Sequence, residues 1–301
     1  MSTEHELRAT SEFLHREFGA DKFDDPRYLR WCYETGPEGA AIQGIVDDDH
    51  GRLATYALVP QRWRNGDEVA RLGITVDACV RSGAQRSGVF RALAADVFER
   101  SGNAGIEGTL TIANANSTPV FIEKLGMVAV GGLPVRATVP VRRGPDVTQV
   151  AADETALAAM AEDAQARTTT GWVRDWDIDS LRWRLASPVN DYVIHRAAEL
   201  WCISTRSAFA HVPVAVVLSL IPRAGRRDVD AARVIGAVGR HHRAPMVIHA
   251  GRHADVRIPG VAVPRRLLPS PLNLLVRGFG ERPTESLRDV AIYEFLDTDH
   301  Y

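Results

Sequence analysis

A polar loop at residues 81–88 (RSGAQRSG) has the residue types that bind phosphate groups. A run rich in β-branched residues precedes it and an amphipathic helical pattern follows it, so the loop leads from a strand into a helix. Free backbone N–H groups and the positive end of the helix dipole meet at such a point and bind anions. Gly88 would let the backbone approach a pyrophosphate, Gln85 and Arg86 could add donors, and Ser87 could cap the helix. The alternative is an ordinary strand-to-helix turn with a solvated arginine.

Two common nucleotide-binding loops are excluded by what surrounds these glycines. Gly83 and Gly88 have the outer spacing of a nucleoside triphosphatase loop. However, Val89 and Phe90 stand where that loop needs Lys and Ser or Thr. The glycines within residues 102–108 follow a helix and precede a strand, which is the wrong order for a dinucleotide-binding fold.

Asp77 is the most suggestive candidate for a general base in this region. Strict strand alternation predicts two faces around it: Ile74, Val76, Ala78 and Val80 on one, and Thr75, Asp77 and Cys79 on the other. A carboxylate in mid-strand is costly unless it is hydrated or paired, so Asp77 is either a base on the substrate side or a structural aspartate. Glu107, at a strand start, is a weaker candidate. Cys79 has no adjacent His to activate it and is interpreted as a small hydrophobic residue rather than a nucleophile.

The elements that must position these residues follow from apolar periodicity and from glycine and proline signals. Helices are predicted at Glu4–Phe18, Pro26–Tyr33, 89–102 and Ser117–Leu125. Strands are predicted at Ala41–Val46, Arg52–Pro60, Val69–Val80, Glu107–Ala113 and Met127–Val141. The polar loop therefore joins the third strand to the third helix.

A second segment, Asn114–Met127, carries a resemblance to a known family. Together with Gln85, Gly88 and Phe90, it resembles the Gcn5-related N-acetyltransferase (GNAT) superfamily. The family's acyl-CoA loop reads Q/R-x-x-G-x-G/A, and a later helix reads N-x-x-A-x-x-x-Y-E-K-x-G-F. Phe90 departs from the final Gly or Ala, although this ending looks like a subgroup that includes relatives acting on nucleotide-linked amino sugars. Ile122 stands where the family has the tyrosine that usually protonates the leaving thiolate.

The resemblance implies an acyl-CoA-dependent N-acyltransferase, most simply an N-acetyltransferase. It acts on a small amine, for which an amino sugar or nucleotide-linked amino sugar is the favoured class. The cosubstrate, acetyl-CoA or another acyl-CoA, enters a sheet that splays between two neighbouring strands, with Asp77 as the catalytic base. Its expected contacts are Ala78, Cys79, Val80, Gln85, Arg86, Ser87, Gly88, Val89, Phe90, Asn116 and Phe121. Because of Ile122, a non-catalytic acyl-CoA-binding or scaffold protein with the same fold remains the alternative.

An internal echo predicts two copies of this fold. Leu29-Arg30-Trp31 and Leu181-Arg182-Trp183 are each followed at similar spacing by a proline and a strand. The predicted fold class is α/β with mixed (α+β) sheets, as tandem GNAT folds over residues 1–146 and 147–301. The second copy is degenerate, because its loop at 222–229 lacks the acyl-CoA pattern, and it is expected to form one wall of the acceptor cleft.

The composition bounds the remaining possibilities. The 301 residues include 36 Lys and Arg against 38 Asp and Glu, and this balance argues against a nucleic-acid partner. No apolar run is long enough for a membrane helix and no signal peptide is recognised, so a cytoplasmic protein without a membrane partner is expected. The sequence leaves open whether the protein forms a homodimer. The three cysteines suggest neither disulfides nor a zinc site, and the spacing of four histidines favours structural roles over a metal: His241, His242, His249 and His253.

Overall fold

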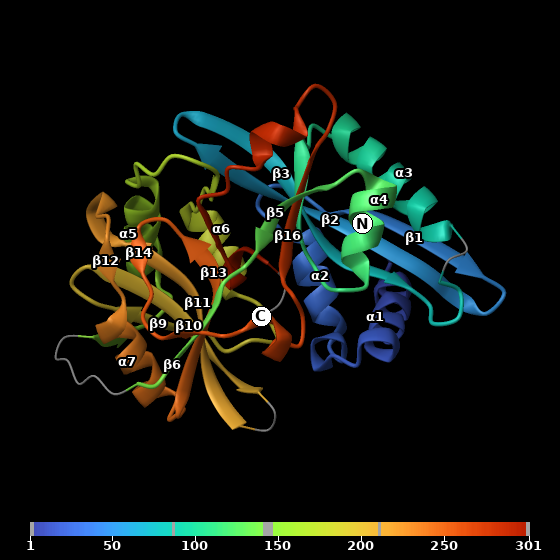
Figure 1. Cartoon of the computed structure of the whole chain (residues 1–301). Helices are drawn as coiled ribbons and strands as arrows, with labels where there is room; N and C mark the ends of the chain where they lie inside the picture. The colour runs from blue at the N-terminus through green and yellow to red at the C-terminus, as the bar shows by residue number, and fades with distance from the viewer. Residues whose placement is uncertain (1–2, 86–87, 141–146, 210–211, 299–301) are drawn as a thin grey trace.

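The computed structural model describes residues 3–85, 88–140, 147–209 and 212–298 (Figure 1). The first half contains α1 (Glu4–Phe18), η1 (Asp21–Phe23), α2 (Pro26–Glu34), β1 (Ile42–Asp48), β2 (Gly51–Asn65), β3 (Glu68–Val80), α3 (Val89–Asn103), β4 (Gly108–Ala113), α4 (Ser117–Leu125), β5 (Val128–Gly132) and β6 (Val135–Thr138). The elements predicted for this half are therefore present, except that the last predicted strand is two strands.

The second half repeats much of this order. It contains β7 (Thr148–Val150), α5 (Glu154–Gln165), β8 (Val173–Arg174), α6 (Ile178–Leu185), β9 (Val193–Arg196), β10 (Leu200–Phe209), β11 (Val212–Pro222), η2 (Arg223–Gly225), β12 (Val229–Asp230), α7 (Ala232–His241), β13 (Met246–His253), β14 (Val256–Arg257), β15 (Val261–Ala262), η3 (Arg265–Leu267), β16 (Asn273–Gly278), η4 (Thr284–Leu287), β17 (Ile292–Glu294) and η5 (Phe295–Asp297). None of the described helices is both long and apolar enough to cross a membrane.

Local signals explain where the first helices begin and end. Thr3 and Glu6 form a capping box at the start of α1, and Gly19 ends the helix in the left-handed conformation at φ 63°. Asp25 caps α2 by accepting from a backbone N–H, with Pro26 at the first helical position. The segment between these two helices is therefore short and fixed at both ends.

The two main sheets have matching strand orders. The first runs β1-β2-β3-β4-β16-β5, and the second runs β15-β6-β13-β11-β10-β9-β7. Read from opposite ends, β1 to β4 correspond to β9, β10, β11 and β13, and β5 corresponds to β15. We call the first sheet with α1 to α4 the first copy, and the second sheet with α5 to α7 the second copy.

The copies exchange one strand each. β16, from the second half of the chain, lies between β4 and β5 of the first sheet. β6, from the first half, lies between β13 and β15 of the second sheet. Neither sheet is therefore complete without the other half of the sequence, and the two halves fold as one unit.

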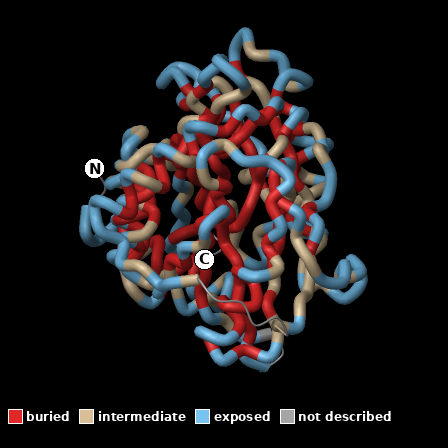
Figure 2. Tube along the Cα trace, turned by 90° about the vertical axis from the view of Figure 1, so that its left-hand side faces the viewer, coloured by how far each residue is buried: buried red, intermediate tan, exposed pale blue. Residues whose placement is uncertain are grey.

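Both copies place their helices in the same way. In β2, Ala57 and Val59 face a core that contains residues of α1 and α2, whereas Tyr56 and Leu58 face a separate core with α3 and α4. Helices α5 and α6 join the core of α1 and α2, and α7 packs on the opposite side of the second sheet. One large core therefore joins the two copies, and Figure 2 shows buried chain running through the middle of the molecule.

The tryptophans of the two repeated Leu-Arg-Trp segments meet in this shared core. The rings of Trp31 and Trp183 are stacked, with centroids 4.9 Å apart and planes 18° apart. Each indole donates to the other residue's backbone carbonyl, Trp31 Nε1 at 2.8 Å and Trp183 Nε1 at 3.1 Å. The interaction is reciprocal, as expected for a pseudo-twofold relation between the copies.

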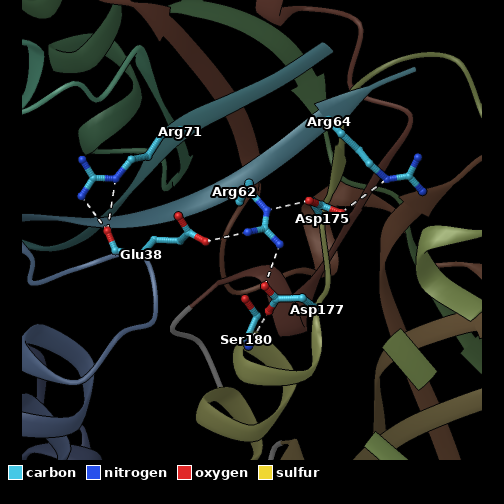
Figure 3. A network of polar contacts seen from close by, with 7 residues as sticks. All are labelled: Glu38, Arg62, Arg64, Arg71, Asp175, Asp177 and Ser180. Carbon is cyan, nitrogen blue, oxygen red and sulfur yellow. Dashed lines mark hydrogen bonds and ion pairs between the residues drawn. The ribbon is translucent and has the colours of Figure 1, made fainter. Parts of the chain in front are cut away.

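A polar network at the edge of the shared core also ties the halves together (Figure 3). Arg62 of β2 donates to Asp175 and to Asp177, each at 2.6 Å, and forms an ion pair with Glu38 at 3.4 Å. Asp177 also accepts from the backbone N–H of Ser180 and so caps α6. Although burial opposes it, the bonds from Ser180 and Arg62 lower the pKa of Asp177, which stays ionised in this role.

Candidate active site

A splay opens the first sheet between β3 and β4. The two strands pair in parallel from Leu72↔Gly108 to Ile74↔Leu110, and the register ends there although β3 continues to Val80. A cavity of about 240 Å³ lies beyond this point. Its lining comes from the end of α1, the connection to α2, β3, β4, the start of α4 and the end of the chain: Phe18, Ala20, Lys22, Phe23, Ile74, Thr75, Val76, Asp77, Ala78, Thr111, Ile112, Asn114, Ser117, Phe121, Tyr293 and Thr298.

A β-bulge in β3 shapes this cavity and corrects the alternation expected from the sequence. Opposite β2, the register passes from Ala57↔Val76 to Thr55↔Cys79, so β3 has one extra residue there. Asp77 lies at the bulge with φ 51°, an uncommon conformation for a residue other than glycine. As a result Cys79 joins the core that contains Ile74 and Val76, whereas Ala78 and Val80 pack toward α3. The prediction that Cys79 shares a face with Thr75 and opposes Val76 is therefore wrong, because the bulge shifts the alternation.

Asp77 is a buried carboxylate on the cavity wall, with 7% of its surface exposed. Tyr33 of α2 donates its hydroxyl to Asp77 Oδ2 at 2.6 Å and fixes the orientation of the carboxylate. Burial, together with the negative charges of Glu17 and Asp77, raises the pKa of Cys79 to about 12. The thiol is therefore protonated at neutral pH, which agrees with its interpretation as a small hydrophobic residue.

The loop before α3 ends at a glycine with a positive φ angle. Gly88 precedes the helix with φ 82°; among the described residues, no side chain caps this end and no atom lies within 4 Å of a Cβ placed on Gly88. Gln85 is exposed, Val89 is half-buried, and Arg86 and Ser87 lie outside the described residues. The half-buried ring of Phe90 packs against Tyr56 and Phe121 at 5.7 and 6.0 Å. The helix start and the bulge thus flank the same end of β3.

The segment before α4 contributes through a residue that the sequence analysis did not select. Asn114 Oδ1 accepts from the backbone N–H groups of Asn116 and Ser117 at 2.9 and 2.8 Å and so caps the helix. Asn114 and Ser117 line the cavity, whereas the exposed Asn116 does not. Phe121 is 2% exposed and lines the cavity.

The position that resembles the family tyrosine does not face the cavity. Ile122 is 40% exposed and is not part of the cavity lining. Its neighbour Phe121 takes the inward position, so the helix presents a hydrocarbon ring where the family resemblance leads one to expect a proton donor. Within the cavity, the described acidic and basic side chains are Asp77 and Lys22.

Several residues that line the cavity or contact its lining had no signal in the sequence. Tyr33 reaches Asp77 across 44 positions, and no local pattern pairs them. Tyr293 and Thr298 come from the end of the chain, so the second half of the sequence contributes two side chains to the lining of this cavity. Phe18 ends α1, and Lys22 lies in the connection that leads into α2, which composition alone does not distinguish from a surface turn.

The equivalent splay in the second copy is filled by the chain itself. β11 and β13 pair as far as Val217↔His249, and β17 then pairs with β13 beyond that point. The Glu294 carboxylate of β17 accepts from Ser219 Oγ and the Leu220 N–H, each at 3.0 Å, and contacts His249 Nε2 at 2.9 Å. A buried side chain thus occupies the splay of the second copy.

Three of the four histidines of the sequence analysis have polar partners, and the ring of His241 packs against that of His242 with centroids 4.9 Å apart. His242 Nε2 lies 2.8 Å from Ser204 Oγ, His249 binds Glu294, and His253 Nε2 donates to the Leu220 carbonyl at 2.9 Å. Over the described ranges, no group of three or more His, Cys, Asp or Glu side chains is arranged to hold a metal ion.

Similarity to known proteins lies in structure rather than sequence. No protein-family model matches the chain, and no curated protein does. A GCN5-related N-acetyltransferase from Anabaena variabilis superposes with a TM-score of 0.64 at 11% identity, over 92% of this chain and 71% of that one. The corresponding enzyme from Kribbella flavida gives 0.59 at 16% identity, over 92% and 69%. This chain has a tandem GNAT fold.

A solved N-myristoyltransferase has a similar arrangement. The Saccharomyces cerevisiae enzyme with bound myristoyl-CoA superposes with a TM-score of 0.62 at 8% identity, over 94% of this chain and 82% of that one. The predicted α/β class, with mixed sheets and two copies, is confirmed by these superpositions and by the strand orders. At such low identities the likeness establishes the fold.

Proposed function

We propose that this protein is an acyl-CoA-dependent N-acyltransferase whose active site is the splay of the first copy. The observation that supports this proposal most is a buried carboxylate, Asp77, on the wall of a cavity. The cavity lies where the pairing of β3 with β4 has ended, beyond Ile74. The start of α3 at Gly88, which no described side chain caps, follows the same strand along the chain. An acyl-CoA needs both features, one for its pyrophosphate and one for its thioester end.

The residues present fit such a cosubstrate. The α3 N-terminus and the open backbone at Gly88 suit the pyrophosphate, and Gln85, Arg86 and Ser87 add polar groups to the loop. The stretch 78–80 follows the bulge beside the splay, where backbone groups no longer pair with β4 and can bind the amides of the pantetheine arm. Phe90, Asn116 and Phe121 are proposed to complete the surroundings, as expected from the family resemblance.

The proposed reaction transfers the acyl group to an amine. The amine nitrogen attacks the thioester carbonyl carbon, a C–N bond forms, and the C–S bond breaks. Asp77 accepts the proton that the nitrogen loses, directly or through a water molecule. The products are an amide and CoA. With Ile122 outside the cavity, the CoA sulfur leaves as a thiolate and takes its proton from solvent, which is feasible because a simple thiol has a pKa of about 8.5.

We assign the acyl-CoA site to residues 1–146 and its structural support to residues 147–301. The acceptor is a small amine, and an amino sugar or nucleotide-linked amino sugar is the class that the loop resemblance favours. Acetyl-CoA is the simplest donor to test. The chain fold itself does not select among these acceptors.

Release of CoA thiol from acetyl-CoA, measured with a panel of amines, tests the proposal. Wild-type protein is expected to release thiol with at least one amine, and Gly88→Glu to abolish this by placing a like charge at the pyrophosphate. Gly66→Glu is the matched control, because Gly66 is exposed in the β2–β3 turn with φ 59° and open space around it. Acyl-CoA binding without thiol release from any amine would favour the non-catalytic alternative. Equal activity of Gly88→Glu and Gly66→Glu would contradict the assigned site.

A further inference from the structure

We propose that the second copy binds a small phosphate-type dianion in a pocket at the end of α7, separate from the proposed acyl-CoA site. The pocket has a volume of about 350 Å³, and its charged and titratable lining residues are Asp191, Arg206, His241 and His242. None of its lining residues lines the cavity of the first copy. Figure 1 shows α7 and β9 in the second copy, away from α3 and α4.

Arg206 of β10 supplies a positive charge to this pocket. Its side chain is exposed, and it forms no hydrogen bond or ion pair with any part of the chain that the structure describes. Burial, His241 and the charge of Arg206 lower the pKa of His242 to about 4, so Arg206 and His242 lie near each other. A guanidinium binds two oxygens of a phosphate or sulfate at once.

A buried hydrogen-bonded chain leads from His242 into the second copy. Ser204 Oγ lies 2.8 Å from His242 Nε2 and 2.8 Å from His195 Nε2. His195 and Ser204 are 0% exposed, and His242 is 8% exposed. The other ring nitrogen of His195, Nδ1, is buried and has no hydrogen-bond partner among the described residues. This orphaned nitrogen determines which way the protons of the chain are arranged.

The single proton of the Ser204 hydroxyl gives the chain a direction. Burial lowers the pKa of His195 to about 3, and His242 is also neutral at pH 7, so each ring carries one N–H. Ser204 donates to one imidazole and must accept from the other. Donation to His195 would place an unpaired N–H at its buried Nδ1, whereas donation to His242 leaves only a lone pair there. Buried N–H groups without a partner are the rarer case in proteins, which favours donation to His242.

In this direction His242 presents a donor to the pocket. Its Nε2 accepts from Ser204, so its proton is on Nδ1, the ring nitrogen left for a ligand. The exposed ring of His241 lies 4.9 Å from that of His242 and makes no hydrogen bond within the described ranges, so it offers a further N–H. A guanidinium and two imidazole N–H groups together match a tetrahedral oxyanion.

Two neighbours oppose an anion and limit its affinity. Asp191 lines the pocket, and its exposed carboxylate forms no ion pair with the described side chains. The negative end of the α7 dipole also lies here, although the Val238 carbonyl is already bonded to the His242 N–H. We therefore expect a dissociation constant on the order of 1 mM for a simple dianion.

Calorimetric titration of the full-length protein with inorganic phosphate and with sulfate tests the proposal. We expect one site per chain in the second copy for either dianion. Ribose 5-phosphate and ribose extend the test: tighter binding of ribose 5-phosphate than of phosphate assigns a phosphate ester, and equal or weaker binding assigns free phosphate. Ribose itself should not bind. Absence of binding of all three anions at millimolar concentrations would overturn the inference.

Variants show which site is measured, because the loop before α3 is also suited to phosphate. Arg206→Gln should weaken binding in the pocket by about 10-fold or more, as expected for loss of a charge-assisted hydrogen bond. Asp191→Asn should strengthen it by about 3-fold, since a like charge is removed. Arg233→Gln is the matched control, because Arg233 is exposed on α7 and outside the pocket. Unchanged binding in Arg206→Gln, or an equal loss in Arg233→Gln, would overturn the inference.

Nitrogen-15 NMR of the imidazole rings tests the proton arrangement without a ligand. We expect His242 as the Nδ1–H tautomer and His195 as the Nε2–H tautomer, with His242→Gln and His195→Gln used to assign the signals. A proton on Nε2 of His242 would present an acceptor to the pocket and would contradict the inferred donor set.

Discussion

The two splays of this molecule have the same strand framework, but one contains a cavity and the other is filled by the chain. In the first copy, β3 and β4 separate after Ile74↔Leu110 and a cavity containing Asp77 follows. In the second copy, β11 and β13 separate after Val217↔His249, and β17 fills the gap with Glu294. Both copies also have a register shift between the second and third strands. The comparison shows that a duplicated scaffold can keep one opening for a ligand and use the other for its own chain.

The two buried carboxylates differ in their partners in a way that fits these contents. Asp77 accepts a hydrogen bond from Tyr33 and faces the cavity. Glu294 is 2% exposed and is bonded to Ser219, to the Leu220 N–H and to His249. Burial alone would raise the pKa of Glu294, but these bonds and the neighbouring histidines lower it. We therefore expect Asp77 to matter for turnover and Glu294 for stability.

Separating the copies should have the largest effect. The fragment 1–146 retains the loop and Asp77 but lacks β16, so β4 and β5 lose the strand between them. We expect this fragment to be insoluble or to show no cooperative thermal transition, because apolar surface normally covered by the second copy is exposed. Co-expression with 147–301 should restore a soluble complex. A soluble, fully active fragment 1–146 would break the account of the exchanged strands.

Matched carboxamide variants should separate the two roles. Asp77→Asn should lower kcat by about 10²- to 10⁴-fold, the usual contribution of a general base, with little change in acyl-CoA affinity or melting temperature. Glu294→Gln should instead lower the free energy of unfolding by about 1–3 kcal/mol, since an amide cannot satisfy all the buried partners of the carboxylate. Steady-state kinetics and thermal unfolding of both variants provide the check. Near-normal kcat in Asp77→Asn would contradict the assignment of the base.

Loss of the reciprocal tryptophan pair should weaken the joint between the copies. Trp31→Ala removes a large buried side chain and its bond to Trp183, so we expect a loss of about 3–5 kcal/mol in the free energy of unfolding. The double variant Trp31→Ala/Trp183→Ala should cost less than the sum of the single variants, because the residues contact each other. Denaturant titration of the three variants measures this. Strict additivity would show that the contact does not couple the two halves.

Acid should destabilise the protein through the second copy. Burial lowers the pKa of His195 to about 3 and that of His242 and His253 to about 4, against about 6.5 in an unfolded chain. The unfolded state therefore binds more protons at these sites below about pH 6.5, and their contribution to stability is lost as the pH falls toward 4. In the first copy the described histidines are exposed: His5, His15 and His50.

Burial also raises the pKa of Asp297 to about 7. The folded state therefore binds more protons at Asp297 as the pH falls, and this stabilises the protein in acid. For this reason the test compares variants with wild type rather than absolute stabilities. The stability difference between wild type and His253→Gln should shift in favour of the variant by about 2 kcal/mol between pH 7.5 and pH 5. His50→Gln should show no such shift. Thermal unfolding at the two pH values is sufficient, and identical shifts in both variants would contradict the assignment to the second copy.

The sequence predicts much of the framework, because local signals determine it. The Leu-Arg-Trp echo predicts two copies, and Trp31 and Trp183 do occupy matching places. The place of β16 in the first sheet is not predictable from one sequence, since exchange of strands depends on pairing across more than a hundred residues.

The candidate site is predicted less completely for two physical reasons. Strand alternation assigns Asp77 and Cys79 to one face, but a bulge cannot be read from a strand that contains no glycine at that point. Tyr33 and Lys22 come from distant segments that tertiary packing brings to the cavity. The loop at Gly88 is predicted correctly as a strand-to-helix turn, because its signal is local.

Calorimetric titration of the full-length protein with acetyl-CoA tests the central claim most directly, because it counts the sites. The open first splay and the filled second splay predict one acyl-CoA per chain, with that binding lost in Gly88→Glu and retained in Gly66→Glu. Two sites per chain, or one site that persists in Gly88→Glu, would contradict the assignment of the cosubstrate to the first copy.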